Sequence, residues 1–353
     1  KERLRFIPQM IFNSIFKNPF FTKKNIETIF YENSRKVKVQ QDETIVSIDP
    51  YTHYYIEGYK KEYEVFEDMY LYNHEKSLYS TNRYLDIFSF YHFFIGKRKK
   101  NKLSTADISF INQVNREIND KLNTDIDLLT EIKVGLINYR SQYLFYKKLF
   151  KKIKPKQLYL VCSYGKGGLI KAAKENNVTV IEFQHGFINS YHMGYHFPTY
   201  EKKDSLVTFP NQLYLFGQFW ADYTSFPITD KNLIMHGYPY LLDQIKKTTI
   251  LKNRKKIIFI SQGTIGKELS KFFYEVAKKL PDYQFIYKLH PGEIYNWESN
   301  YPLLIRAQTL DNVEIREKSN IYEDFSESMI QVGVYSTALF EGIAFNCKTI
   351  LLS

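Results

Sequence analysis

The sequence predicts an α/β protein made of two doubly wound halves, each with a parallel sheet covered by helices. Two observations carry this prediction. Short, continuous apolar runs such as Leu158–Val161 and Ile257–Ile260 have the composition of strands that are buried on both faces. Helical patterns separate successive runs, as they must where a crossover joins parallel strands. With 353 residues, the chain is long enough for two domains that each have a core.

The first hundred residues carry little periodic signal. Thr44–Ile48 fits one strand, and residues 51–91 are crowded with Tyr. From about Thr105 to Lys152 the apolar residues recur with a helical period, and Asn123–Asp125 is a polar break between two helices. We therefore expect a helical segment over residues 105–152, ahead of the first clear strands.

Two alternating regions follow. In the first, the expected strands are Leu158–Val161, Val178–Phe183, Leu213–Phe216 and Leu233–Met235. In the second, they are Ile257–Ile260, Phe285–Tyr287, Val332–Val334 and Ile350–Leu352, all predicted to be buried. The polar, basic segment 246–256 has the composition of a linker, so we expect one domain at residues 1–248 and another at 249–353. No covering helix follows the last strand, so we expect the natural chain to continue past Ser353.

The net charge of +11 and the pI near 9.2 predict anionic partners. Three classes are open: nucleic acid, an anionic membrane surface, and nucleotide or acidic-sugar substrates. Lys and Arg are spread along the chain without the signature of a nucleic-acid-binding motif. We therefore expect no nucleic-acid partner.

Other features bear on where the protein works. The two cysteines, Cys162 and Cys347, are too few for a disulfide framework and fit buried thiols in a reducing compartment. No run has the length of a membrane span, and the first residues lack a signal-peptide pattern. We expect a cytoplasmic protein that contacts the inner face of the membrane through basic and aromatic surface.

Polar loops follow three of the expected strands in the second half: Ser261–Thr264, Lys288–Glu293 and Tyr335–Thr337. Ligands bind at the carboxyl ends of parallel strands, so these loops predict a nucleotide-phosphate site. His290 is followed by Pro291, whose ring restricts its backbone, and a positioned imidazole stabilises charge on a leaving phosphate. The alternative is a capped turn with an exposed histidine.

Two hydroxyls stand at the start of the last expected helix. Ser336 and Thr337 offer donors to a phosphate together with the free N–H groups of the helix start. A serine at this position is also an ordinary N-cap. Glu341, one turn later, is placed to hold ribose hydroxyls, or it is a solvated helix residue without a role.

In the first half, Gln184–Gly186 follows an apolar strand and places the His185 imidazole at the cleft. A histidine has a pKa suited to removing a proton from an acceptor hydroxyl. The Gly-rich loop Ser163–Gly168 offers either an anion-binding turn or only a tight connection. His192 and His196 invite a zinc site, but their spacing lacks the partners that such sites use, so we expect no metal.

Some of these segments resemble a known family. Lys288–Pro291 contains its His-Pro pair, and Ser336–Thr337 matches its Ser-Ser/Thr pair. Over residues 158–353 the chain resembles bacterial GT-B glycosyltransferases of cell-surface polysaccharides, in the superfamily of sialyltransferases and Kdo transferases, with the CDP-glycerol phosphotransferases nearby. The resemblance implies a GT-B-like fold, in which two Rossmann-like domains face each other across a cleft.

The resemblance also implies roles for single residues. Relatives bind the CMP phosphate through the His-Pro and Ser/Thr residues, which here are His290, Ser336 and Thr337. Their general base is an acidic residue in a motif that this chain lacks, so both His185 and Glu182 are candidates, and His185 is preferred. The full donor-side set is Gln262, Gly263, Thr264, Lys288, His290, Pro291, Ser336, Thr337 and Glu341. The acceptor-side set is Tyr164, Lys166, Gln184 and Gly186.

The expected function is inverting, metal-independent transfer of a sugar from a CMP-activated donor to a glycan of a bacterial capsule or lipopolysaccharide. The sugar is expected to be a nonulosonic acid such as sialic acid, or Kdo, and no further cofactor is expected. Two alternatives stay open. One is a CDP-glycerol or polyol phosphotransferase of teichoic-type polymer synthesis, and the other is a non-catalytic anion-binding module.

Overall fold

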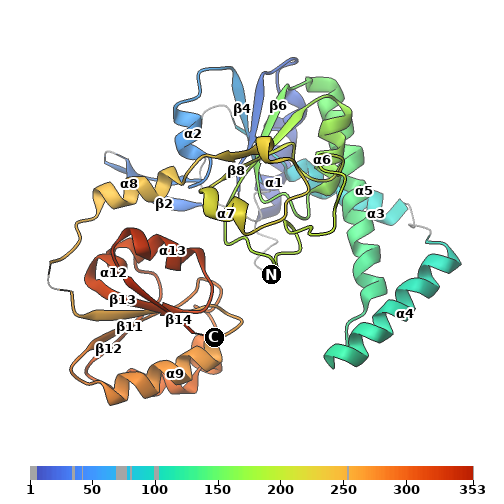
Figure 1. The fold of residues 1–353 in the computed structure, drawn as a ribbon. Helices are drawn as coiled ribbons and strands as arrows, with labels where there is room; N and C mark the ends of the chain where they lie inside the picture. Colours follow the sequence, from blue (N-terminus) through green and yellow to red (C-terminus); the bar gives the residue numbers. More distant parts are fainter. Residues whose placement is uncertain are drawn as a thin grey trace. The chain divides into compact units, whose positions relative to one another are not determined.

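The computed structural model describes residues 6–33, 36–41, 43–68, 78–79, 82–98, 103–252 and 254–352. The chain divides into two units, Lys1–Gly237 and Tyr238–Ser353, and each unit is built around a parallel sheet (Figure 1). The predicted α/β class with two Rossmann-like domains is therefore confirmed. Helix α8 (Pro239–Lys247), which the sequence places at the end of the first domain, falls in the second unit.

The first unit contains a seven-stranded sheet with the order β5-β4-β1-β6-β7-β8-β9, and every pair in it is parallel. Its strands are β1 (Thr28–Tyr31), β4 (Tyr63–Glu67), β5 (Asn82–Tyr84), β6 (Gln157–Val161), β7 (Thr179–Phe183), β8 (Gln212–Leu215) and β9 (Leu233–Met235). The chain runs outward from β1 to β5, then returns to β6 and runs outward on the other side. The topological switch point of this sheet therefore lies between β1 and β6.

Three of the seven strands of this sheet come from the region that gave little periodic signal. The strands β6 to β9 confirm the four strands predicted for the first alternating region, whereas β1, β4 and β5 were not predicted. Thr44–Ile48 forms the predicted strand, β3, but it pairs antiparallel with β2 (Val37–Gln41) in a separate hairpin.

The helices of the first unit are α1 (Ile7–Phe16), α2 (His53–Glu57), α3 (Asp86–Arg98), α4 (Thr105–Leu122), α5 (Leu128–Ile153), α6 (Gly167–Glu175) and α7 (Gln218–Asp222), with 3₁₀ helices at Pro19–Phe21 and Asp230–Asn232. The two predicted helices of the 105–152 segment are α4 and α5. Asn123 ends α4 in the left-handed conformation, with φ of 49°. Asp127 caps α5 by accepting the N–H of Thr130 at 3.0 Å. Figure 1 shows this helical pair extending away from the sheet.

Close packing of α5 on α6 depends on a glycine. A Cβ at Gly168 would lie 2.1 Å from the carbonyl oxygen of Tyr139, so no larger residue fits between the two helices. The core beneath them is apolar and includes Phe145, Leu149 and Leu160. This packing fixes the start of α6, and with it the loop that follows β6.

The second unit contains a five-stranded parallel sheet with the order β12-β11-β10-β13-β14. Its strands are β10 (Lys256–Ile260), β11 (Gln284–Lys288), β12 (Val313–Arg316), β13 (Ser328–Gly333) and β14 (Lys348–Leu351). The four predicted strands are present, and β12 is the one that the sequence missed. The chain leaves β10 on one side towards β12 and returns on the other side through β13, so the switch point lies between β10 and β13.

The remaining helices of this unit are α9 (Gly266–Lys279), α10 (Trp297–Asn300), α11 (Pro302–Ala307), α12 (Ile321–Glu327) and α13 (Thr337–Ala344). Phe259, Phe273 and Tyr287 pack together in the core between the sheet and α9. The last strand departs from its prediction. We expected a buried strand, but β14 lies at the sheet edge and all four of its residues are exposed.

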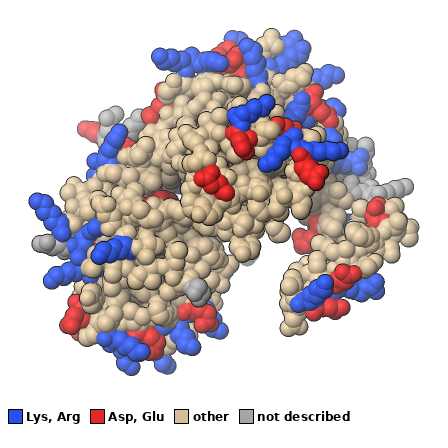
Figure 2. Space-filling view, viewed as in Figure 1, with Lys and Arg blue, Asp and Glu red and all other residues tan. Residues whose placement is uncertain are grey.

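Charged side chains are scattered over the surface. Figure 2 shows Lys and Arg in several separate groups, interleaved with Asp and Glu, which agrees with their spread along the sequence. Among the described residues, no helix has both the length and the apolar character needed to cross a membrane.

Candidate functional site

Three polar loops of the second unit lie next to one another at one edge of its sheet. They follow β10, β11 and β13, and β10 pairs with both of the other strands. Since neighbouring strands are about 4.8 Å apart, the three loops occupy roughly 10 Å of that edge. The loop after β10 and the loop after β13 flank the switch point, where open α/β sheets bind ligands.

A buried carboxylate joins the first two loops. Glu293 is only 4% exposed, and its Oε1 accepts hydrogen bonds from Ser261 Oγ at 2.9 Å and from Tyr301 OH at 2.7 Å. Its Oε2 accepts the backbone N–H of His290 at 2.7 Å. Because one carboxylate holds groups from both loops, their relative position at the edge is fixed.

We call the Glu293 carboxylate and its three hydrogen bonds the brace. The start of α9 leaves room for the brace only because Gly266 has no side chain. A Cβ there would lie 2.3 Å from Glu293 Oε1 and 2.2 Å from Tyr301 OH. Tyr287 completes the cluster, since its hydroxyl lies 3.0 Å from Ser261 Oγ and 3.2 Å from the carbonyl oxygen of Gly266. Helix α9 therefore begins directly against the brace.

The His290 ring is oriented by a hydrogen bond within its own loop. Its Nδ1 accepts the backbone N–H of Gly292 at 3.1 Å, which assigns the proton of the neutral ring to Nε2. The residue is exposed, as is Pro291 beside it. The arrangement presents an imidazole Nε2–H as a hydrogen-bond donor at the rim of the sheet.

The loop after β13 is joined to the loop after β10 by a hydrogen bond between Tyr335 OH and Thr264 Oγ1. Ser336 is the N-cap of α13, because its Oγ accepts the N–H of Ala338 at 3.2 Å. Thr337 is the first helical residue, so its backbone N–H has no partner within the helix. Ser336 therefore makes an ordinary capping interaction at the half-buried start of α13, where the first N–H groups of the helix are free of helical partners.

The other donor-side residues differ in their surroundings. Gln262 and Gly263 lie in the loop after β10, where Gly263 is exposed. Lys288 is 8% exposed, and its Nζ donates to Ser319 O at 2.6 Å and Ser319 Oγ at 2.7 Å and pairs with Asp324 at 3.3 Å. Its ammonium group is therefore directed at α12 and the loop before it.

Glu341 lies on α13, where its Oε2 accepts a hydrogen bond from Tyr322 OH at 2.6 Å. Burial raises the pKa of this carboxyl, and the hydrogen bond from Tyr322 opposes that rise. Glu341 is thus neither a fully solvated helix residue nor a group without a partner.

The acceptor-side residues belong to the first unit. His185 follows β7 and is half-buried, and its Nε2 lies 3.2 Å from Tyr164 OH in the loop after β6. The hydroxyl of Tyr51 donates to the backbone carbonyl of His185 at 2.8 Å. An imidazole and a phenol are therefore in hydrogen-bond contact at the carboxyl ends of neighbouring strands.

Two other predicted residues hold the backbone around His185. Glu182 is fully buried, and its Oε1 accepts the N–H of Ser163 at 2.8 Å and the hydroxyl of Tyr195. Burial raises the pKa of Glu182. Gln184 donates from Nε2 to Gly186 O at 2.9 Å and accepts the N–H of Phe216 at 2.8 Å. Their contacts are those of residues that position the two loops.

The two histidines that suggested a zinc site each accept a hydrogen bond from a backbone N–H. His192 Nδ1 accepts the N–H of Gly194 at 3.2 Å, and His196 Nδ1 accepts the N–H of Ser225 at 3.1 Å. Burial lowers the pKa of His192. In the part of the chain that the structure describes, no group of three or more His, Cys, Asp or Glu side chains is placed to hold a metal ion.

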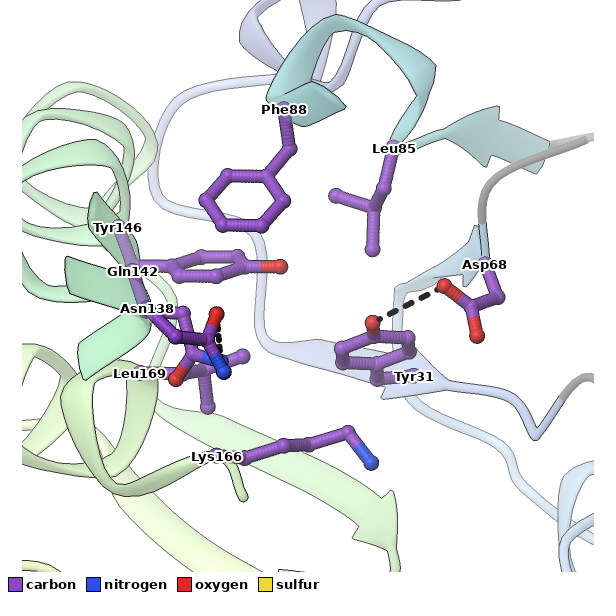
Figure 3. Close-up of a pocket in the computed structure, with 9 residues that line it drawn as sticks. All are labelled: Tyr31, Asp68, Leu85, Phe88, Asn138, Gln142, Tyr146, Lys166 and Leu169. Carbon is purple, nitrogen blue, oxygen red and sulfur yellow. Dashed lines mark hydrogen bonds between the residues drawn. The ribbon is translucent and has the colours of Figure 1, made fainter. Parts of the chain in front are cut away.

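A cavity of about 160 Å³ opens at the switch point of the first sheet. Figure 3 shows the nine residues that line it: Tyr31, Asp68, Leu85, Phe88, Asn138, Gln142, Tyr146, Lys166 and Leu169. Gln142 donates from Nε2 to Gly165 O at 2.8 Å, while its Oε1 is buried without a hydrogen-bond partner among the described residues. Aromatic walls and an acceptor oxygen are the lining that a hydroxylated ligand needs.

Lys166 connects this cavity with the loop that carries Tyr164. Its Nζ donates to Cys162 O at 2.8 Å and Val161 O at 3.1 Å, and it lies 5.3 Å from the centroid of the Tyr31 ring. The cavity and the Tyr164–His185 pair therefore border the same short loop. Cys162 begins that loop with φ of 64°, a value that few residues other than glycine adopt.

Sequence reasoning missed several residues of both sites. Glu293 lies in a predicted polar loop, but no sequence pattern marks it as the residue that joins two loops, and Tyr301 lies outside the predicted loops. In the first unit, Tyr31, Asp68 and Gln142 come from segments without a readable motif. In the second unit, Gly266 at the start of α9 is a signal in the sequence for this close packing.

Comparison with known proteins bears on the fold. No family model matches this chain, and no curated protein matches its sequence. A UDP-GlcNAc 2-epimerase from Neisseria meningitidis, solved with UDP-GlcNAc bound, aligns over 93% of this chain and 82% of its own, with 13% identity and a TM-score of 0.50. The Methanocaldococcus jannaschii UDP-GlcNAc 2-epimerase aligns over 92% of this chain and 83% of its own, with 8% identity and a TM-score of 0.51. The shared feature is the fold, with two Rossmann-like domains. The narrower resemblance to sialyltransferases and Kdo transferases finds no support in these matches.

Proposed function

We propose that this chain is a nucleotide-sugar enzyme, and specifically an inverting glycosyltransferase that works without a metal ion. The observation that carries the proposal is the braced rim of the second unit. There the His290 Nε2–H and the start of α13, with Ser336 and Thr337, are presented at one edge of the sheet. Hydroxyls, a positioned imidazole and free helical N–H groups together suit a phosphate. The UDP-GlcNAc bound by the Neisseria meningitidis neighbour supports a nucleotide sugar as the ligand class.

For the donor we propose a CMP-linked nonulosonic acid or Kdo. The His-Pro and Ser-Thr pairs support CMP, and the net charge of +11 favours an acidic sugar. His290 donates to the leaving phosphate, Ser336 and Thr337 hold it, and Glu341 accepts from a ribose hydroxyl while Tyr322 orients its carboxyl. Lys288 has a positioning role, because its ammonium group is engaged with Ser319 and Asp324.

For the acceptor we propose a hydroxyl of a capsule or lipopolysaccharide glycan, bound by the first unit. His185 takes the acceptor proton, the acceptor oxygen forms a bond to the anomeric carbon, and the bond from that carbon to the phosphate oxygen breaks. CMP leaves with the electron pair of that bond. Tyr164 orients the imidazole, and the cavity beside Lys166 takes a neighbouring sugar, whose hydroxyls donate to Gln142 Oε1 and Asp68.

The fold supports a second candidate, a nucleotide-sugar 2-epimerase, because the epimerases of Neisseria meningitidis and Methanocaldococcus jannaschii share it. The CDP-polyol phosphotransferase is a third. The products separate these reactions: transfer releases CMP and lengthens the acceptor, epimerisation changes the sugar without an acceptor, and phosphotransfer leaves a phosphate in the polymer. Mass spectrometry of reactions with CMP-, UDP- and CDP-linked donors distinguishes them.

The first test is calorimetric titration of the full chain with CMP, CDP and UDP. We expect CMP to bind and the His290→Ala variant to bind it at least about tenfold more weakly, the effect of losing one hydrogen bond to a charged group. His196→Gln is the matched control, because His196 lies in the first unit and should leave the affinity unchanged. Failure of all three nucleotides to bind would contradict the enzyme proposal and leave the anion-binding module.

A further inference from the structure

Helix α1 presents an apolar surface outward. The exposed residues Ile7, Ile11, Ile15, Phe12 and Phe16 recur at helical spacing on the side opposite its buried residues, Met10 and Asn13. Phe12 and Phe16 contact each other, with ring centroids 4.9 Å apart. A helix on the surface of a globular protein normally turns its polar side outward, and α1 does the reverse.

Helix α3, which packs beside α1, adds a second set of exposed aromatic residues. Its exposed residues Phe90, Phe93 and Phe94 lie on one side, whereas Phe88 and Tyr91 pack inward against Phe145. The two helices adjoin, because Asn13 Nδ2 donates to Asp86 Oδ2 at 2.8 Å. We call the exposed set the apolar face: Ile7, Ile11, Phe12, Ile15, Phe16, Phe21, Phe90, Phe93 and Phe94.

The residues of the apolar face are strongly exposed. Phe16 is 62% exposed, Phe21 57% and Phe94 56%. With about 200 Å² for a whole aromatic side chain, the nine residues leave on the order of 800 Å² of apolar surface in water. Exposed apolar residues gathered in this number on adjoining segments are a mark of an interaction site.

Lysines lie beside aromatic residues that adjoin the apolar face, and the one acidic residue of α1 and α3 among the described residues, Asp86, is buried against Asn13. Lys148 Nζ lies 5.8 Å from the centroid of the Tyr91 ring, and Lys152 Nζ lies 5.9 Å from that of Phe20. We call Lys24, Lys148, Lys151 and Lys152 the lysine border; all four are exposed. The sequence has no Asp or Glu at positions 6–26 or 132–174. Lys23, nearby, is paired with Glu62 at 2.7 Å.

We propose that the apolar face of α1 and α3, with its lysine border, docks this protein on the headgroup region of an anionic bilayer. Phe and Ile on one side of a helix, flanked by Lys, are the composition of helices that lie in the membrane interface. At ten residues, α1 is about 15 Å long, half the hydrocarbon thickness, so it lies in the plane of the interface. A second copy of the chain is a poorer occupant, because it would bring an identical lysine border against this one.

The test is sedimentation of the full chain with vesicles of phosphatidylcholine alone or with 30% phosphatidylglycerol. No nucleotide is present, so the result is independent of the donor site. We expect binding to the anionic vesicles that is weakened by added salt. Each lysine near an anionic surface contributes about fivefold in affinity, so Lys148→Gln/Lys151→Gln/Lys152→Gln should bind on the order of a hundredfold more weakly.

Two further variants test the apolar contribution. Phe12→Ser/Phe16→Ser should abolish binding, whereas Phe110→Ser/Phe272→Ser, which changes two exposed phenylalanines elsewhere, should bind as the unchanged chain does. Since all four side chains are exposed, thermal unfolding should be similar in both variants. In Phe16→Trp, fluorescence should shift to the blue with anionic vesicles, because the native Trp220 and Trp297 are already buried.

Three results would overturn the proposal. The first is no binding to anionic vesicles, and the second is binding that Phe12→Ser/Phe16→Ser leaves intact. The third is a dimer in sedimentation velocity that this variant dissolves, which would assign the face to a second copy of the chain.

Discussion

The buried carboxylate of Glu293 offers the sharpest test of how the donor-side rim is built. It accepts three hydrogen bonds, from Ser261 Oγ, Tyr301 OH and the N–H of His290, at 2.7–2.9 Å. In Glu293→Gln the side chain keeps its size, but its NH₂ group has to face one of these donors. One hydrogen bond is lost and the other two lose their charge assistance, so we expect the second unit to lose about 2–4 kcal/mol of unfolding free energy.

The structure supplies a local probe for this measurement. Trp297 is 3% exposed and its backbone N–H donates to the carbonyl of Glu293 at 2.9 Å, so in a Trp220→Phe background its fluorescence reports the unfolding of the second unit. Urea titrations of Glu293→Gln and of the control Glu298→Gln, whose side chain is exposed, give the difference. If the two variants agree within about 0.5 kcal/mol, the carboxylate does not brace the loops and the reasoning fails.

Three further predictions follow from the same contacts. Gly266→Ala places a Cβ 2.2 Å from Tyr301 OH and should lower the unfolding free energy in urea by about 2 kcal/mol or more. The control Gly263→Ala, whose Cβ would have its nearest neighbour at 3.9 Å, should lower it much less. Equal losses in the two variants would contradict the close packing at Gly266. Burial lowers the pKa of His236, so the unfolding free energy of the first unit should be intact above pH 6.5 and should decrease as the pH falls below that value. In urea titrations at pH 5 and pH 7.5, His236→Phe should reduce this pH dependence. The same pH dependence in the variant would contradict the prediction. Ser336→Ala removes an N-cap and should lower the unfolding free energy by about 1 kcal/mol. It should also weaken CMP binding in calorimetry. An unchanged affinity for CMP would remove Ser336 from the proposed site.

The strands that the sequence predicted are those made almost entirely of apolar residues. Strands such as β6 and β10 are continuous apolar runs, and they fixed both the α/β class and the edge at which polar loops gather. Strand β4 has the sequence Tyr-Glu-Val-Phe-Glu and gives no such run, although Glu64 and Glu67 are buried. Their charges are balanced from elsewhere in the chain, by Arg83 at 2.5 Å and Lys36 at 2.7 Å. A pattern that looks only for apolar runs misses such a strand.

The sequence predicted where the candidate residues lie in the fold, but not which residues they contact. His290, Ser336 and Thr337 were placed correctly at the carboxyl edge of the second sheet, because that depends only on where strands end. Contacts between distant residues leave no trace in a single sequence. The Glu293–Ser261 hydrogen bond joins two such residues, and so does the pairing of Lys288 with Asp324, which directs that ammonium group towards α12.

We propose that the rim of the second unit binds the phosphate of a nucleotide, and a crystal structure of the full chain with CMP would show where that phosphate lies. We expect the phosphate within hydrogen-bonding distance of His290 Nε2 and of the first N–H groups of α13, with the hydrogen bonds of Glu293 unchanged. CMP bound in the first unit alone, or with its phosphate away from both groups, would contradict it.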